Sequence, residues 1–168
     1  MAGSTAISPP ARARSPYWYV LAGGLVAGTL DMTYACVFWA VRRGVGSERI
    51  FQSVAAGILG KASFEGGAST AAFGLMLHYF IATTMALVYY LVASHWPRLQ
   101  PRPLLWGAGY GLLLYFIMNF IVVPLSAAAP GSKDPLWVSL SIAVHMLFIG
   151  IPCALFATRA LSIRPATD

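Results

Sequence analysis

The 168-residue sequence has few charged residues, and acidic residues are the scarcest. Asp, Glu, Lys and Arg together make up 10% of the chain, against roughly 25% in a typical soluble domain. Hydrophobic residues make up 58%, which is more apolar surface than a soluble domain of this length can bury. The scarcity of charge therefore argues against a soluble fold and predicts one membrane-embedded domain.

Cysteine is also scarce, since the chain contains only Cys36 and Cys153, both within apolar segments. Neither belongs to a CxxC pair, and two membrane-embedded thiols do not make a disulfide framework. We interpret both as small apolar residues that pack against neighbouring helices.

Motifs of known enzymes are missing as well. The chain has no Gly-rich phosphate loop, no GxSxG nucleophile elbow and no HExxH helix, so no motif supports an enzyme. The formal net charge is +6, but the basic residues lie in the tails and loops rather than in one stripe. This distribution suits the head groups of anionic lipids. Without a nucleic-acid motif, we expect no nucleic-acid partner.

Four long apolar segments dominate the rest of the chain, and each reaches the length of about 20 residues that a membrane-spanning helix needs. We predict an all-α membrane protein in which four transmembrane helices form a bundle. The membrane domain covers residues 17–160, between a basic disordered tail at 1–16 and a polar tail at 161–168. The predicted spans cover residues 17–41, 68–94, 104–129 and 136–158.

Residues 47–61, between the first two spans, predict a different kind of helix. Ser47 is expected to cap it, and Glu48 is expected to lie in its first turn. An apolar stripe at helical spacing comprises Ile50, Phe51, Val54, Ala55, Ile58 and Leu59. The segment is too short to cross a bilayer. We therefore predict an amphipathic helix that lies in the membrane interface or re-enters the membrane.

Each predicted span carries one polar residue whose burial in hydrocarbon is expensive. The four residues are Asp31, His78, Asn119 and His145. Counted from one membrane face, each lies nine or ten residues into its span, which at 1.5 Å per residue is roughly 14–15 Å deep. We therefore predict a polar layer near the middle of the bilayer. If the protein has a chemical or transport function, we expect it in this layer.

Small residues share helical faces with the polar residues. Gly24 and Gly28 precede Asp31 on one face of the first span, and Gly107 and Gly111 repeat the same spacing in the third span. This GxxxG pattern lets two helices approach closely. These faces should therefore meet other helices, either within the bundle or in a homo-oligomer.

The polar layer is open to several interpretations. A hydrogen-bonded network would set the register of the helices and give the protein a structural role. Alternatively, Asp31 and His78 bind a proton, and the protein transports a small solute coupled to that proton. Asn119 and His145 would then complete the site. A water-accessible path from one membrane face to the layer would favour transport over the structural role.

Cofactor binding is a further alternative, although we predict no cofactor. His78 and His145 lie at one depth on different helices and could ligate haem in the core of the bundle. Together with Asp31 they would supply three ligands to zinc, with one position open. The sequence contains no ligand-spacing motif that supports either group.

Pro124 and Pro152 fall inside the third and fourth spans. Each removes one helical hydrogen bond and frees a carbonyl group one turn earlier, near Phe120 and Phe148. We expect a packing kink at each proline. The alternative is a freed carbonyl that lines a solute or ion site.

Three segments carry a resemblance: GLMLHY at 74–79, MNFIVVPL at 118–125 and HMLFIGIP at 145–152. Through them, residues 17–160 resemble a group of small, mostly uncharacterised bacterial inner-membrane proteins. The resemblance implies four spans in a bacterial inner membrane and supplies no activity. Small multidrug transporters also have four spans and a carboxylate in the first. Their carboxylate is a Glu, however, and the long amphipathic first loop here departs from that pattern.

The distribution of basic residues predicts the orientation only weakly. Six basic residues lie on the side of the two termini and five on the opposite side. The positive-inside rule therefore favours cytoplasmic termini by one residue. Such a balance also suits a dual-topology dimer.

Overall fold

A computed structural model of the chain describes residues 15–163. Within this range all regular structure is helical, and four helical stretches are long and apolar enough to cross a membrane. The predicted all-α, four-span bundle is therefore confirmed. Most of both predicted tails lies outside the described residues. The four stretches are Pro16–Arg43, Gly67–His95, Pro103–Leu125 and Pro135–Ser162.

The first two spans are uninterrupted helices. α1 covers Pro16–Arg43 and α3 covers Gly67–His95. Proline suits the first position of α1, where a backbone N–H would have no helical partner. Gly44 ends α1 at a φ of 64°, a left-handed conformation that favours glycine.

The third and fourth spans are each interrupted by a π segment that ends two residues before a proline. Proline has no N–H, and its ring displaces the carbonyl group one turn earlier. The wider π turn accommodates that displacement. Each proline therefore widens the turn before it, where the sequence predicted a kink. In chain order the segments are α4 (Pro103–Ile117), a π segment (Met118–Val122) and α5 (Val123–Leu125), then α6 (Pro135–Val144), a π segment (His145–Gly150) and α7 (Ile151–Ser162).

In the fourth span, the π segment allows the helix before it and the helix after it to face the bundle. Ser141 and Val144 are buried before the segment, and Ile149 and Cys153 are buried within and after it. In a regular helix each residue turns by about 100°, so the five-residue step from Val144 to Ile149 would rotate the second half away from the core. The extra residue in the π turn removes that mismatch.

The third span ends at Leu125, four residues before the predicted end at 129. Ser126 is extended, with φ −89° and ψ 174°, and the next backbone N–H, of Ala127, donates to the carbonyl of Gly57 at 3.0 Å. This bond connects the end of the third span to the short helix between the first two spans instead of continuing the helix.

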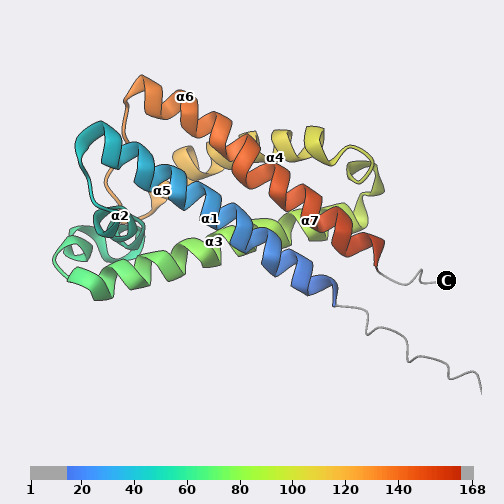
Figure 1. Ribbon diagram of the computed structural model, residues 1–168, viewed down its shortest axis with the longest axis horizontal. Coiled ribbons are helices and arrows are strands. Elements are labelled where there is room, and N and C mark those ends of the chain that lie inside the picture. The colour runs from blue at the N-terminus through green and yellow to red at the C-terminus, as the bar shows by residue number, and fades with distance from the viewer. Residues whose placement is uncertain (1–14, 164–168) are drawn as a thin grey trace, which may run out of the picture.

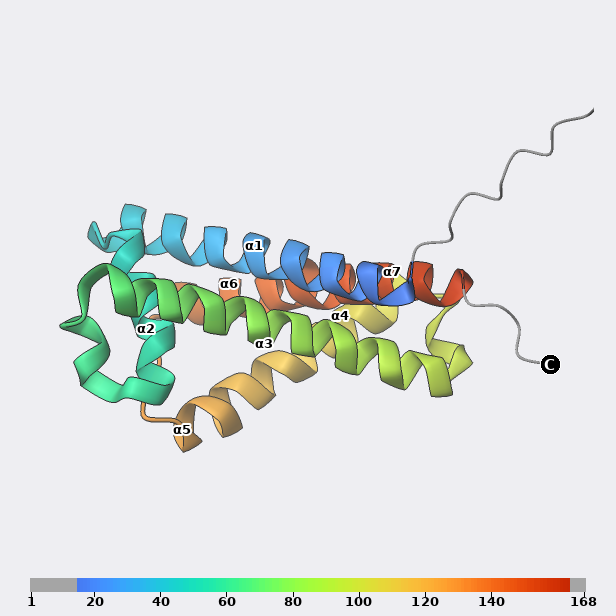
Figure 2. The ribbon, with the colours of Figure 1, turned by 90° about the horizontal axis from the view of Figure 1, so that it is seen from below.

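That short helix, α2 (Ser47–Leu59), runs crosswise to the long helices at one end of the bundle (Figures 1 and 2). A 3₁₀ turn, Gly60–Phe64, follows it. The prediction that Ser47 caps α2 is wrong: Gly46 occupies the capping position, Ser47 is the first helical residue, and no side chain caps the helix. The end of the bundle that contains α2 is called the α2 face, and the end that contains Pro16 and Ser162 is called the terminal face.

The buried side of α2 differs from its predicted apolar stripe. Gln52, Ala55 and Ala56 are buried, whereas Ile58 and Leu59 are 59% and 43% exposed. The reason is close backbone packing, because the carbonyl of Phe51 leaves no space for a Cβ at Gly74 of α3. Small side chains permit this approach. The buried Gln52 amide donates to the carbonyl of Gly67 at 3.1 Å. Its polar donor therefore has a hydrogen-bond partner in the interior.

Glycine contacts hold the long helices together, as the GxxxG spacing predicted. Gly24 and Gly28 of α1 pack against Thr83 and Tyr79 of α3. A Cβ on Gly111 of α4 would overlap the backbone of the π segment His145–Gly150. These three glycines are therefore in contact with helices of the same chain.

Candidate functional site

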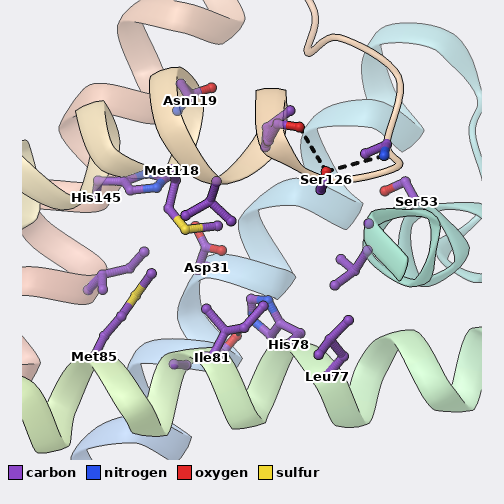
Figure 3. Close-up of a pocket in the computed structure, with 18 of the residues that line it drawn as sticks. Asp31, Ser53, Leu77, His78, Ile81, Met85, Met118, Asn119, Ser126 and His145 are labelled. Carbon is purple, nitrogen blue, oxygen red and sulfur yellow. Dashed lines mark hydrogen bonds between the residues drawn. The ribbon is translucent and has the colours of Figure 1, made fainter. Parts of the chain in front are cut away.

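The four polar residues of the predicted layer border one cavity. Asp31 lies on α1, His78 on α3, and Asn119 and His145 on the two π segments. The cavity has a volume of about 390 Å³, within the range of small-molecule sites, and we call it the polar chamber. Figure 3 shows Asp31 near its centre, His78 and His145 on different sides of Asp31, and Asn119 at the edge.

Asp31 is the only acidic residue in the four spans. Both imidazoles lie close enough to interact with its charge, but no described residue donates a hydrogen bond to its carboxyl group. An unpaired carboxylate in a low-dielectric interior costs several kcal/mol. Asp31 therefore needs a proton, water or a bound cation as its partner.

The two histidines each use one ring nitrogen for a backbone carbonyl. His78 Nε2 lies 2.8 Å from the carbonyl oxygen of Gly28, and His145 Nδ1 lies 2.9 Å from that of Ser141. A carbonyl oxygen only accepts hydrogen bonds, so these nitrogens carry the protons. In the neutral rings, Nδ1 of His78 and Nε2 of His145 are therefore acceptors.

Asn119 binds its own helix. Its side-chain amide donates to the carbonyl of Tyr115 at 2.9 Å. His145 likewise binds a carbonyl one turn earlier in its own span, and only His78 bonds to a different helix. The four polar side chains thus share a cavity without forming a hydrogen-bonded network with one another among the described residues.

A second cavity of about 210 Å³ shares Asp31, His78 and His145 with the polar chamber. We call it the side cavity. It extends toward the α2 face, where Trp39 and Trp137 line it. Tyr34 and Ser141 also line it, and their buried hydroxyl groups lie close to each other, without a hydrogen bond of good geometry to any described residue. A cavity of this size has room for several water molecules.

A cluster of aromatic rings lies at the outer end of the side cavity. The ring of Trp137 lies 5.5 Å from that of Tyr34, 5.0 Å from Phe38 and 5.1 Å from Trp39, measured between centroids. Such aromatic clusters are typical of the level of the lipid head groups. These rings therefore place the outer end of the side cavity near the membrane surface.

Beside this aromatic cluster, Asp134 connects the first and fourth spans. Its carboxylate accepts hydrogen bonds from the backbone N–H groups of Leu136 (2.9 Å) and Trp137 (3.4 Å), and lies 3.4 Å from the guanidinium of Arg42. Partial desolvation raises the pKa of Asp134, but the two N–H groups and Arg42 together lower it more, so the pKa lies below its usual value of 3.8.

The predicted layer left out four polar residues that line the two cavities: Tyr34, Ser53, Ser126 and Ser141. Tyr34 lies three residues after Asp31 and therefore on the same side of the helix, a signal that could have identified it. Ser53 does not belong to the predicted apolar stripe of α2, yet it lines both cavities. Its position depends on how α2 packs against α3, which the sequence pattern does not reveal.

The geometry gives the cofactor alternatives no support. The described part of the chain contains no group of three or more His, Cys, Asp or Glu side chains arranged to hold a metal ion, so Asp31, His78 and His145 do not form the zinc site considered above. For haem, the chamber adds nothing to the two imidazoles that is specific for a porphyrin.

No protein-family model, curated protein or solved structure matches this chain. Its function therefore has to be inferred from the geometry of the polar chamber.

Proposed function

We propose that this integral membrane protein binds a proton at Asp31 and couples that proton to the movement of a small solute through the polar chamber. One observation carries the proposal: a carboxyl group and two imidazoles, from three different spans, border a single cavity. An imidazole donates a hydrogen bond through one ring nitrogen and accepts through the other, so His78 and His145 are suited to pass a proton to or from Asp31.

The hydrogen bonds favour this function over a purely structural role. A register-setting network requires bonds between helices, yet Asn119 and His145 bond within their own spans. The close approach of the helices is already explained by the glycine contacts at Gly24, Gly28 and Gly111. Asp31 adds a desolvation cost and no interhelical hydrogen bond, so a structural role leaves it unexplained.

The side cavity supports proton access from the α2 face. Water molecules in this cavity would connect Asp31 with the region beneath Trp39 and Trp137. We further propose that the protein resides in a bacterial inner membrane with both termini in the cytoplasm. In that orientation the α2 face is periplasmic, and protons reach Asp31 from the side where the proton-motive force supplies them.

The direct test is infrared difference spectroscopy on the full chain in lipid nanodiscs, recorded between acidic and neutral pH. We expect a carboxyl C=O band that is present in the wild type and absent in Asp31→Asn. Glu65→Gln is the matched control, because Glu65 is an exposed acid in the turn before α3. The other carboxyl groups of the chain give bands in both spectra, so identical carboxyl bands in the wild type and Asp31→Asn would contradict proton binding at Asp31.

Coupling is tested in proteoliposomes under an imposed pH gradient. Small solutes are screened for accumulation that depends on the gradient, and Asp31→Asn should abolish accumulation while Glu65→Gln retains it. Accumulation that persists in Asp31→Asn would separate transport from this proton site.

A further inference from the structure

A large apolar groove lies between α3 and α4. It has a volume of about 780 Å³ and is lined almost entirely by apolar and aromatic side chains. Phe80 of α3 and Leu113 of α4 line it and are 67% and 53% exposed. Both helices cross the membrane, so these exposed side chains face lipid. We call this feature the lateral groove.

The lateral groove adjoins the polar chamber, and the two share part of their walls. Ile81, Met85, Met118 and Val122 line both cavities, and in Figure 3 the side chains of Met118 and Asp31 point into the same space. Methionine is unbranched and flexible, so the two methionines at this junction can change rotamer to admit a ligand. Movement of these side chains would give a molecule in the groove access from the lipid to Asp31.

The chemistry at the inner end of this path selects one class of head group. Asp31 supplies a carboxylate without a hydrogen-bond donor, and the available ring nitrogens of His78 and His145 are acceptors when the rings are neutral. All three groups therefore favour a ligand that donates hydrogen bonds, and the carboxylate favours one with a positive charge.

We propose that the solute is a single-chain hydrophobic amine, with its tail in the lateral groove and its ammonium group at Asp31. This inference rests on the proposed proton site. In a low-dielectric chamber the carboxylate needs one neutralising partner, so a proton and an ammonium ion compete for it. Protonated Asp31 and the ammonium ion (R–NH₃⁺) give the ion pair, and the released proton passes to water. Binding of the amine and of the proton is thereby mutually exclusive.

The groups around Asp31 set the pH dependence of this exchange. The titratable groups that border the same cavities are His78 of α3, His145 of the fourth span and Tyr34 of α1. α2 and the third span contribute Ser53 and Asn119, which do not titrate in the accessible range. Any pH dependence beyond that of Asp31 must therefore arise from the two imidazoles or from Tyr34.

Isothermal titration calorimetry tests the exchange on the full chain in nanodiscs, with empty nanodiscs subtracted. The probes are dodecylamine, dodecanol and dodecanoate, which share one tail and differ in head group. We expect dodecylamine to bind at least about tenfold more tightly than the other two. Titrations in two buffers of different ionisation enthalpy should show up to one proton released per amine bound, at a pH where Asp31 is protonated.

Two variants separate the head-group site from the groove. Asp31→Asn should remove both the preference for the amine and the proton release. Gly109→Trp should weaken all three probes, because Gly109 borders the groove and a side chain there meets no atom within 4 Å. Leu147→Trp is the matched control, since Leu147 is an exposed residue outside the groove.

The outcomes distinguish this inference from the proposed function. Equal binding of the three probes would mean that the groove holds acyl chains without regard to the head group, and tighter binding of dodecanoate would reverse the charge assignment. Either result overturns the amine proposal while the infrared band of Asp31 remains. Loss of that band together with retained amine binding would instead overturn the proton site.

Discussion

The two sides of α3 differ in how closely they allow a neighbouring helix to approach. On the side toward α1, the small residues Gly24 and Gly28 of the partner helix leave no gap against Thr83 and Tyr79. On the side toward α4, Met85 and Ile81 border open space, and the lateral groove separates the two helices over much of their length. The difference teaches that residue size on the facing sides decides whether a helix pair closes or leaves a cavity.

The closed side and the open side also differ in chemistry. Where α1 and α3 touch through glycine, close packing stabilises the pair, and His78 and Tyr79 add hydrogen bonds to the carbonyl of Gly28 and the hydroxyl of Thr29. Where α3 and α4 separate, the space between them adjoins the chamber of the one carboxyl group in the spans. The closed side of α3 thus contributes mainly to stability and the open side to the proposed binding, and His78 contributes to both.

The largest effect is expected from Gly111→Val on the tightly packed side of α4. The new side chain would overlap the backbone of the π segment at His145, and overpacking of this kind costs about 1–3 kcal/mol or more. Thermal unfolding in nanodiscs should show a large drop in melting temperature or no folded protein. Gly109→Ala, two residues away on the open side, is the control and should be neutral or slightly stabilising. Equal melting temperatures for the two variants would show that the glycine contact is not essential.

An effect of the opposite sign on the melting temperature is expected from Asp31→Leu. An Asp at the centre of a membrane helix costs about 2.5–3.5 kcal/mol on insertion scales, and Asp31 has no donor among the described residues to offset that cost. The variant should therefore unfold at a higher temperature than the wild type while losing the pH-dependent infrared band. A lower melting temperature would instead support the register-setting network.

A smaller difference in stability is expected between substitutions of the two histidines. His78→Phe removes a hydrogen bond between α3 and α1, whereas His145→Phe removes one within the fourth span. Loss of a typical hydrogen bond costs about 1 kcal/mol, so His78→Phe should lower the stability to denaturant more than His145→Phe does. If the order is reversed, His145 holds the bundle together through a contact other than its carbonyl bond.

The smallest change in melting temperature is expected from substitution of Asp134, on the α2 face. Its pKa is lowered in the folded protein, so the ionised group contributes stability above its usual pKa of 3.8, and this contribution is lost as the pH falls through the lower, folded value. Asp134→Asn keeps a capping side chain but removes the charge opposite Arg42. Its melting temperature should lie slightly below that of the wild type at neutral pH and converge with it in acid. A constant difference across this range would show that the charge is unimportant.

Much of the candidate site could be predicted from the sequence, because the depth of a residue depends only on the helical rise. Counting along each span placed Asp31, His78, Asn119 and His145 at one level, and all four border the chamber. Counting could not predict the hydrogen-bond partners of these side chains. Asn119 and His145 turn toward carbonyls of their own spans, and that choice depends on side-chain rotamers and on the neighbouring helices.

The prolines and α2 show where local patterns become insufficient. Pro124 and Pro152 indicated a disrupted turn, but whether the turn kinks or widens depends on keeping both halves of the span against the bundle. The stripe on α2 indicated an amphipathic helix. The close contact between Phe51 and Gly74 nevertheless buries Gln52 and leaves Ile58 exposed, because backbone proximity favours small side chains over the most apolar ones.

The sequence by itself determined the helical class, the number of spans and the depth of the polar residues. These properties follow from hydropathy and from the rise of 1.5 Å per residue, which are local. Only the tertiary structure decided that α1 and α3 close tightly, that α3 and α4 leave a groove, and that this groove adjoins the chamber of Asp31. Those features depend on which helical faces meet, and in a membrane that is set by the fit of side chains between segments distant in the chain.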